Sequence, residues 1–531
     1  MLVSIGAKLI PEASNISTPI PMLLPGSLVR DATGLVRSVL NRASGFSGFG
    51  ISACLLVHVW QPNLRFEVER LRLDGMLLKN TTVVNLHEDL SRDDPGNSPS
   101  PYALQTFEGY ESGLRKVPDD SSADVVRYYA EDEYVLFVMH EAFSGQVLFA
   151  DHLRNGKRYK RSFFDSGNLE IKVAWFNQAN DLEAEEFFTK SGRRYLLDES
   201  PGKYIGRIRA YDSEMNETIF ASRGELIHYW LSNFRPDLVE NSVLISEYAF
   251  MFGGLQKLRI TNNCGVIYTL HSSHLSNPHR YGAPVKPELV ETLENLKLMD
   301  ALVVLTPQQR FDLMKSTGAP NVEVIPHAHA KQSEVRRRIP REPGLFVMVS
   351  RLSKEKQHEV VIREFARLAA DQLEAKLEIW GTGPLEQELR ELIIGLKMED
   401  RIKLKGFTKE PLNEYARAEV GLFSSQYEGQ SISLMEALSQ GCVPVAYDFK
   451  YGPRMLIRDM VNGIIVDMND SADLVSSAFK LIIDRELLSD LSENSIQSVE
   501  EFTQEAMAIS WIALFNKVKS NKHLGKHDSF R

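Results

Sequence analysis

From Pro343 onwards, short and wholly apolar runs alternate with amphipathic helical patterns. The run GLFVMVS precedes the helical pattern QHEVVIREFARLAAD, and KLEIWG precedes PLEQELRELIIGLK. RIKLKGF, VGLFSS and CVPVAYD continue the alternation. Strands that are apolar throughout are buried on both faces, which is typical of a parallel sheet covered by helices. The pattern therefore predicts a doubly wound α/β domain.

A second zone, roughly 240–329, has the same alternation. Its apolar runs SVLISEY, GVIYTL, ALVVLT and VEVIPH are separated by helical patterns such as KPELVETLENLKLM. The beginning of the chain resembles it, since GLVRSVLNRAS has a helical pattern and ISACLLVHVW the pattern of a strand. We expect both parts to form one further α/β domain, in which STPIPMLLPG makes a poor strand. Two such domains facing each other commonly enclose a cleft.

Between these zones the pattern changes to strands separated by turns. YVLFVMHEA, QVLFADHL, KRYKRSFF, LEIKVAWF and KYIGRIRAYD are strand-like, and Asn155-Gly156 and Ser166-Gly167 are hairpin dipeptides. We therefore predict an antiparallel β-sheet inserted into the first α/β domain. The expected borders are 1–74 with 236–335 for the first domain, 75–235 for the insertion and 336–531 for the second domain, whose last helix, about 503–518, we expect to cross back.

Size and composition exclude several classes of protein. At 531 residues the chain is too long for one core, so we expect two to four domains. A net charge of -10 argues against a dedicated nucleic-acid-binding protein, which needs a basic surface. The three cysteines lie far apart, which suits a reducing cytoplasm. No apolar run reaches the length of a membrane span, and the first residues lack the features of a signal peptide.

Polar residues follow the predicted strands of the second domain. Ligands bind beyond the carboxyl ends of parallel strands, so these residues are candidates for one site. In chain order they are Arg351 with Lys356, then Gly381-Thr382-Gly383, then Phe407-Thr408, and finally Tyr427 to Ser431 before a helix expected to start near Ser433.

Two cations and a helix N-terminus in this set suggest an anion site. Arg351 and Lys356 follow one strand, and the free backbone N–H groups of Gly429 to Ser431 precede the helix. Together they form a plausible diphosphate clamp. Taken alone, the two cations are also compatible with an ordinary solvated loop.

Glu428 and Glu436 flank the start of that helix. Glu436 could simply stabilise the helix N-terminus electrostatically. Beside a diphosphate site, however, carboxylates have a use as acceptors of hydrogen bonds from sugar hydroxyls. A nucleotide sugar supplies both kinds of group, so the pattern favours a nucleotide-sugar site.

The spacing Arg351-x4-Lys356 with Glu428-x7-Glu436 resembles the donor site of family 4 retaining glycosyltransferases, which have the GT-B fold. SSQYEGQSISLMEAL followed by PVAYDFKYGP is similar to bacterial wall teichoic acid poly(glycerol/ribitol phosphate) α-glycosyltransferases. Those enzymes carry an antiparallel β-sheet insertion in the first domain. Accessory-secretion enzymes that glycosylate serine-rich adhesins have the same layout. The resemblance implies two Rossmann-like domains facing a cleft.

The resemblance also implies roles for individual residues. The predicted catalytic residues are His271, Arg351, Lys356 and Glu428. The predicted donor-binding residues are Gly34, Gly381, Gly383, Phe407, Thr408, Gly429, Gln430, Ser431 and Glu436, with Glu436 on the ribose and Glu428 on the hexose. The family has a Gly-Gly loop where this chain has Thr33-Gly34, so the first glycine is replaced and the role of Gly34 is in doubt.

Histidines of the first domain allow more than one interpretation. His271, in YTLHSSH, aligns with the histidine that the family places near the reacting sugar; otherwise it simply closes a strand end. His274 and His279 could suggest a metal site, but no Cys or carboxylate stands at ligand spacing, and we expect none. His327 and His329 fit a loop between the domains.

The expected reaction is a metal-independent transfer with retained α configuration, from UDP-glucose or UDP-N-acetylglucosamine, with no cofactor. No D-x-D motif occurs to bind a metal-bridged diphosphate. The leaving diphosphate would then be neutralised by the cations and the helix N-terminus.

The acceptor is expected to be an anionic polyol-phosphate polymer of the cell wall. A basic hairpin of the insertion is the candidate contact, although charge on an edge strand also prevents aggregation. Its cations are Arg154, Lys157, Arg158, Lys160 and Arg161. A Ser/Thr-rich protein acceptor, or a non-catalytic acceptor-binding partner, are the alternatives. We further expect a cytoplasmic enzyme, peripheral at the inner membrane face and homo-oligomeric through the insertion.

Overall fold

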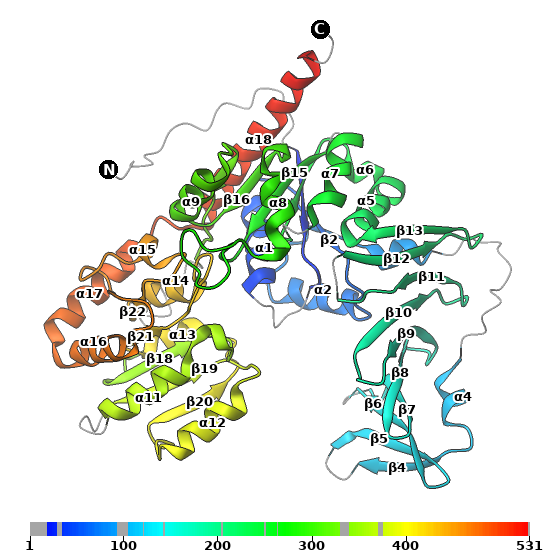
Figure 1. Ribbon diagram of the computed structural model, residues 1–531, viewed down its shortest axis with the longest axis horizontal. Helices are drawn as coiled ribbons and strands as arrows, with labels where there is room; N and C mark the ends of the chain where they lie inside the picture. Colours follow the sequence, from blue (N-terminus) through cyan, green and yellow to red (C-terminus); the bar gives the residue numbers. More distant parts are fainter. Residues whose placement is uncertain are drawn as a thin grey trace.

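Three β-sheets, two parallel and one antiparallel, organise the part of the chain that the structure describes (Figure 1). The protein is represented by a computed structural model, and the first sheet lies between the other two lobes. The residues that the structure describes are 19–28, 34–92, 105–119, 122–141, 144–202, 205–248, 251–262, 264–329, 339–369 and 375–528.

The first domain contains a seven-stranded parallel sheet. Its strands, in spatial order, are β17 (Val322–Val324), β16 (Ala301–Val304), β15 (Gly265–Leu270), β14 (Ser242–Ser246), β1 (Ile20–Leu24), β2 (Cys54–Val57) and β3 (Thr82–Asn85). Four of these strands are buried at every position, as both faces of the sheet carry helices. The principal helices are α1 (Gly34–Gly48), α2 (Leu64–Leu73), α5 (Arg223–Phe234), α7 (Phe252–Thr261) and α9 (Pro307–Thr317).

The expectation of a poor strand in STPIPMLLPG was wrong. Residues Ile20–Leu24 form β1 in the middle of the sheet, paired with β14 on one side and β2 on the other. Pro21 is tolerated as the second residue of the strand, and Met22, Leu23 and Leu24 are fully buried. Burial of three apolar side chains outweighs the one backbone donor that proline lacks.

The insertion is a ten-stranded antiparallel sheet in which each strand pairs with the next along the chain. The strands are β4 (Arg115–Asp119), β5 (Ser122–Ala130), β6 (Glu133–His140), β7 (Val147–Arg154), β8 (Lys157–Phe164), β9 (Glu170–Phe176), β10 (Leu182–Phe188), β11 (Arg194–Asp198), β12 (Ile205–Tyr211) and β13 (Glu217–Ser222). Asn155 and Gly156 both have positive φ in the β7–β8 turn, as the dipeptide predicts. In the next turn the residue with positive φ is Asn168, one position after the predicted Ser166-Gly167.

The expected border at residue 75 precedes a strand of the first sheet. β3 pairs in parallel with β2, and Asn85 caps the short helix α3 (Leu86–Leu90). We therefore propose that the insertion begins after α3 and ends where α5 starts.

The second domain contains a six-stranded parallel sheet in the order β20-β19-β18-β21-β22-β23. Its strands are β18 (Leu345–Val349), β19 (Lys376–Trp380), β20 (Ile402–Gly406), β21 (Val420–Phe423), β22 (Val443–Tyr447) and β23 (Ile464–Val466). The covering helices are α11 (His358–Ala369), α12 (Glu386–Gly395), α13 (Pro411–Arg417), α14 (Ile432–Ser439), α16 (Ser471–Ile483) and α17 (Arg485–Ser498). The strand order reverses between β18 and β21, which is where a doubly wound sheet forms its ligand crevice.

The last helix, α18 (Gln504–Asp528), returns to the first domain and lies along α1 (Figure 1). Trp511 and Phe515 are fully buried there, and the ring of Phe515 packs edge-on against Phe46 at 5.4 Å. The first core therefore includes side chains from the far end of the chain. None of the helices in the described part of the chain is both long and apolar enough to span a bilayer.

Candidate functional site

The carboxyl ends of the two parallel sheets meet at the contact between the domains. A Cβ atom on Gly429 would lie 2.3 Å from the backbone oxygen of His271. The backbone N–H of His327 donates to the Gln430 side chain at 2.7 Å. The two predicted halves of the site, the loop before α14 and the loop after β15, are thus in contact.

Lys356 and Glu428 form an ion pair within the second domain. Lys356 ends the 3-10 turn η4 (Lys354–Lys356) after β18, and Glu428 lies on the loop after β21. The Ser425 hydroxyl donates to the same carboxylate at 3.1 Å. The sheet order reverses between β18 and β21, and this reversal brings the two side chains together. The sequence assigns the cation to the phosphates and the carboxylate to the hexose.

Arg351 lies at the mouth of this crevice with its side chain 70% exposed. Its guanidinium donates to Glu355 at 2.6 Å, and the hydroxyl of Ser353 donates to the same carboxylate oxygen at 2.6 Å. Partial burial raises the pKa of Glu355, but these hydrogen bonds outweigh it and lower the pKa to about 2. Glu355 was not predicted, although it stands between the two predicted cations.

Helix α14 begins at Ile432, one residue before the expected start, and its N-cap is Ser431. The Ser431 hydroxyl accepts from the backbone N–H of Leu434 at 3.3 Å. Gly429 accommodates the backbone of His271, since any side chain would collide with it. The loop is therefore shaped by the domain contact as well as by the helix.

Glu436 lies in the second turn of α14 rather than in the first. Its side chain is mostly buried, and Arg37 of α1 approaches it to 3.8 Å from the first domain. Burial raises the pKa of Glu436 to about 7, although the charge of Arg37 opposes this shift. Arg37 is a second residue that the sequence did not indicate.

The predicted glycines after β19 are required by close backbone packing. A Cβ on Gly381, whose φ is +139°, would lie 1.9 Å from the Ser350 oxygen, and one on Gly383 would lie 2.3 Å from the Leu352 oxygen.

Phe407 is half exposed after β20, and the Thr408 hydroxyl accepts from the backbone N–H of Glu410. Gly34 is the first residue of α1 with no atom near its missing side chain, whereas Thr33 lies outside the described residues.

His271 is held from behind by a buried acid. Its Nε2 is 2.5 Å from Glu247, which follows β14 just as His271 follows β15. Arg42 of α1 donates to the other oxygen of Glu247 at 2.7 Å. Burial disfavours the charged carboxylate, but Arg42 and His271 prevail and hold the pKa of Glu247 at about 2. Neither partner was predicted, although Glu247 was visible as the residue after the apolar run SVLIS.

The other histidines contact groups of both domains. The buried ring of His327 stacks on His271 at 5.5 Å, and its Nδ1 lies 3.0 Å from the Ser38 hydroxyl. His274 stacks on Tyr451, and His279 contacts Tyr427, at centroid distances of 5.9 and 4.0 Å. Within the described part of the chain, no group of three His, Cys, Asp or Glu is arranged to hold a metal ion.

Most cations of the basic hairpin already have acidic partners. Arg158 and Arg161 both pair with Asp151, and Lys160 pairs with Glu170 at 2.9 Å. Arg154 lies over the Tyr159 ring, and the Lys157 ammonium donates to the Gln178 backbone. Three of the five predicted cations therefore stabilise the insertion itself.

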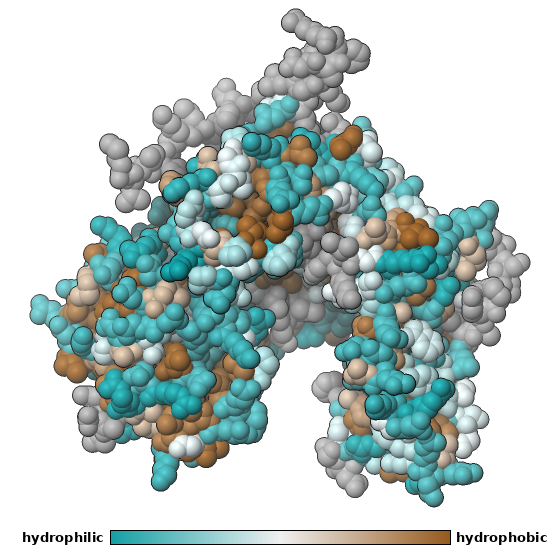
Figure 2. All heavy atoms as spheres, viewed as in Figure 1, coloured by the Kyte–Doolittle hydropathy of each residue, from teal (hydrophilic) through white to brown (hydrophobic). Residues whose placement is uncertain are grey.

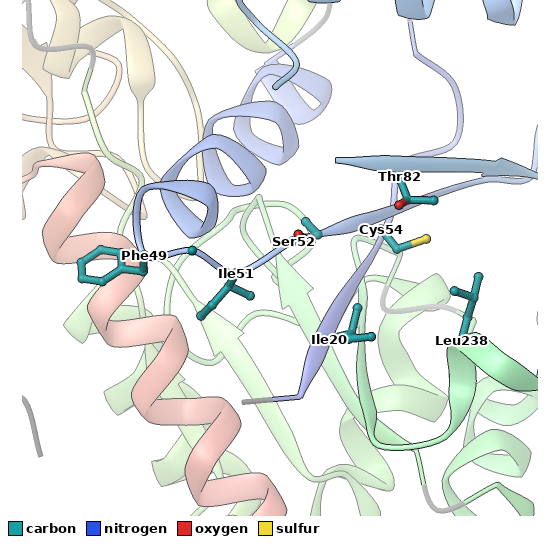
Figure 3. Close-up of a pocket in the computed structure, with 9 residues that line it drawn as sticks. Ile20, Phe49, Ile51, Ser52, Cys54, Thr82 and Leu238 are labelled. Atoms are coloured by element: carbon teal, nitrogen blue, oxygen red, sulfur yellow. The ribbon is translucent and has the colours of Figure 1, made fainter. Parts of the chain in front are cut away.

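A cavity of about 440 Å³ lies at the opposite edge of the first sheet (Figure 3). Ile20, Cys54 and Thr82 line it at the starts of β1, β2 and β3, together with Phe49 and Leu238. Ligands of parallel sheets bind at the carboxyl ends of the strands, so this cavity is on the wrong side for the nucleotide site. It contains none of the predicted site residues.

Comparison with known proteins identifies the fold and the second domain. Residues 331–498 match the family Glycosyl transferases group 1. The second domain is therefore a group 1 glycosyltransferase domain. It is 22% identical over 530 residues to the poly(glycerol-phosphate) alpha-glucosyltransferase of Bacillus subtilis (strain 168), covering 95% of this chain and 77% of the relative. It is 23% identical over 489 residues to the poly(ribitol-phosphate) alpha-N-acetylglucosaminyltransferase of Staphylococcus aureus (strain COL), covering 91% and 97%.

The structure of the whole chain resembles that of a TarM mutant from S. aureus, crystallised with Fondaparinux, alpha-GlcNAc-glycerol and UDP. The TM-score is 0.75 with 20% sequence identity, and the match covers 94% of this chain and 100% of that one. This likeness confirms the predicted GT-B fold with an antiparallel insertion in the first domain.

Proposed function

We propose that this glycosyltransferase transfers glucose or N-acetylglucosamine from a UDP-sugar to a polyol-phosphate polymer of the cell wall, with retention of the α configuration. The activities of the two teichoic-acid relatives and the TarM-like fold support the substrate class. The observation that carries the proposal is the contact between the His271 backbone and Gly429, the neighbour of Glu428 in the Lys356–Glu428 pair, which would bring the predicted diphosphate site next to the candidate reaction centre.

In this proposal Lys356 changes its ion-pair partner when the donor binds. Without ligand, Lys356 and Glu428 neutralise each other. A bound diphosphate would compete for the ammonium group and release Glu428 to accept hydrogen bonds from hexose hydroxyls. Arg351 and the N-terminus of α14 would share the diphosphate charge, and Glu436 would hold the ribose.

The leaving group would then be stabilised without a metal. As the bond to the sugar breaks, negative charge grows on the diphosphate, and Lys356, Arg351 and the helix N-terminus are the groups that neutralise it. Lys356→Ala is expected to lower kcat about a hundredfold or more. Lys354→Ala, in the same turn, is the matched control and should retain activity. Activity that survives chelation supports the metal-free reaction, and activity restored by one added divalent cation contradicts it.

For the acceptor we propose the open side of the molecule. Figure 2 shows a hollow between the second domain and the insertion, with mainly hydrophilic side chains on both lobes. Of the basic hairpin, Arg154 and Lys157 are the predicted phosphate contacts, because the other three cations are paired with acids. Replacing both by Glu should raise KM for the polymer and flatten its salt dependence.

A matrix of donors and acceptors tests the function. UDP-glucose and UDP-N-acetylglucosamine are each incubated with glycerol-phosphate polymer, ribitol-phosphate polymer and a Ser/Thr-rich protein, and UDP release and product mass are measured. Transfer to a polymer supports the proposal. Transfer to the protein alone supports the alternative acceptor, and absence of both UDP binding and turnover supports a non-catalytic partner.

The proposal includes a cytoplasmic enzyme, peripheral at the inner membrane face, that self-associates through the insertion. Cys54 and Cys442 are free thiols and, like Cys264, they are buried, which fits a reducing compartment. β4 is an edge strand of the ten-stranded sheet, and such an edge can pair with a second chain. Cell fractionation tests the location. Light scattering tests the assembly, and a monomer at all concentrations contradicts it.

A further inference from the structure

Behind His271 lies an ion pair that is hidden from solvent. The side chain of Glu247 is 0% exposed and that of Arg42 is 3% exposed. Arg42 donates to both carboxylate oxygens, at 2.7 and 3.4 Å. The free energy lost when two charges leave water offsets much of their mutual attraction. A buried ion pair is therefore weak evidence of a purely stabilising role. Its position at the carboxyl ends of β14 and β15 points to the site instead.

One oxygen of Glu247 fixes the proton of His271. It accepts from Thr269 Oγ1 at 2.8 Å and lies 2.5 Å from His271 Nε2. The low pKa of Glu247 means that this carboxylate is ionised at neutral pH and can only accept. When the imidazole is neutral, its proton must therefore be on Nε2, which leaves the lone pair on Nδ1.

Nδ1, the other ring nitrogen of His271, belongs to a partly exposed side chain. This side chain is on the loop that contacts Gly429. The side chain is 17% exposed, and none of the described residues forms a hydrogen bond with Nδ1. The backbone oxygen of the same residue faces the Gly429 loop. An unpaired acceptor next to the predicted sugar site has a use, because a sugar hydroxyl can donate to it.

The ring is also restrained on one face. His327 stacks on it with an interplanar angle of 11°, and Ser38 holds His327 through Nδ1. Arg42 in turn lies 4.6 Å from the centre of the Trp511 ring on α18. The orientation of His271 thus depends on α1, on the loop after β17 and on the returning helix.

We infer that Glu247 is a positioning residue that holds the His271 ring with its proton on Nε2, so that Nδ1 accepts a hydrogen bond from a hydroxyl of the transferred sugar. Arg42 holds Glu247 in place. This inference rests on the proposed sugar transfer.

The decisive variant is Glu247→Gln. Its amide can donate to Nε2 and so permits the opposite tautomer, in which Nδ1 carries the proton and no longer accepts. We expect kcat to fall at least about tenfold, because changing an orienting carboxylate to its amide puts a functional histidine in the wrong tautomer, while the affinity for UDP stays unchanged. In protein labelled with nitrogen-15 histidine, the His271 signals should shift from the Nε2–H to the Nδ1–H pattern. A His271→Gln variant assigns those signals.

Two further variants separate positioning from folding. Arg42→Gln with Glu247→Gln removes both buried charges, so it avoids an unpaired guanidinium yet should keep the slow turnover. Asp89→Asn is the matched control: Asp89 is also a buried carboxylate of the first domain and pairs with Arg235 at 2.7 Å. It should lower Tm without changing kcat or the His271 signals.

The results distinguish this inference from the proposed function. If wild-type protein transfers sugar and Glu247→Gln retains both the wild-type kcat and the Nε2–H tautomer, the positioning role is overturned. A fall in activity that only follows Tm, as in Asp89→Asn, overturns it as well. If wild-type protein transfers no sugar but Glu247→Gln still switches the tautomer, the proposed function fails and the geometric part of the inference holds.

Discussion

The carboxyl group of Glu436 is buried in the second turn of α14, and this burial raises its pKa to about 7. The folded state binds this proton more tightly than the unfolded state does. The free energy of unfolding therefore falls as the pH rises from about 4.5 to 7. Glu436→Gln should therefore raise Tm at pH 8 relative to wild type. The corresponding gain in the free energy of unfolding is on the order of 3 kcal/mol. Thermal unfolding at pH 5 and pH 8 measures the difference, which should be small at pH 5 and vanish below about pH 4.5.

The same titration should control donor binding. If Glu436 accepts hydrogen bonds from the ribose, the affinity for UDP-glucose should fall as the pH drops from 8 to 6. UDP-glucose is the suitable probe, because its phosphates do not titrate in this range. Glu436→Gln should bind weakly and without pH dependence, and an unchanged affinity in this variant would contradict the ribose role.

Gly429 contributes through the side chain it lacks. Its Cβ would lie 2.3 Å from the His271 backbone, and backbone atoms cannot rotate away as a side chain can. Gly429→Ala should therefore push the two loops apart and lower kcat/KM about tenfold or more, since small misplacements of reacting groups are costly. Gly395→Ala, in α12 with no neighbouring atom within 4 Å, is the control and should be neutral or slightly stabilising. Steady-state kinetics compare the two variants.

Helix α18 is the element that joins the end of the chain to the first core. Trp511 is 2% exposed and touches Phe515 and Arg42. Trp511→Ala should lower the free energy of unfolding by about 3–5 kcal/mol. Ile509→Ala, on the exposed side of the same helix, should change it by less than about 0.5 kcal/mol. Denaturant unfolding measures both, and equal effects would show that α18 packs only loosely on α1.

The alternation of apolar runs and helical patterns was sufficient to predict both parallel sheets, because buried strands have a wholly apolar signal. The pattern failed at β1 and at the border of the insertion. Pro21 masked a central strand, and β3 is too short and too exposed at its first residue to be recognised without its partner β2. Pairing between strands far apart in sequence decides both cases.

The candidate site was predictable where a residue follows a strand of its own zone. Lys356, Glu428 and His271 were found in this way, and their roles stay predictions. Arg37 and Arg42 were not found, because they lie on a helix face whose neighbours belong to other elements. The pairing of Arg158, Lys160 and Arg161 with acids was equally hidden, since the partners lie on neighbouring strands.

At the scale of the whole molecule, the candidate site is assembled by contacts between the two domains. Asp312 of α9 accepts from Lys450 at 2.5 Å and from the Tyr451 hydroxyl at 3.0 Å, and both partners lie after β22 of the second domain. Tyr427 is held similarly, between His279 and the Lys286 ammonium, which lies 4.4 Å from its ring centre. These contacts flank the crevice and favour the closed arrangement.

Removing the Asp312 contact should therefore shift the domains towards separation. In Asp312→Ala, Lys450 and Tyr451 lose their partner, so we expect a larger radius of gyration in small-angle scattering and a KM for the UDP-sugar raised about fivefold or more. Glu323→Ala is the control, because it removes an exposed ion pair with Lys517 of α18 inside the first domain. It should change neither the radius of gyration nor KM. Because binding of the donor to both domains favours closure, a saturating UDP-sugar should restore the wild-type radius in Asp312→Ala. A radius that is unchanged without ligand, or unaffected by it, would show that Asp312 does not hold the domains together.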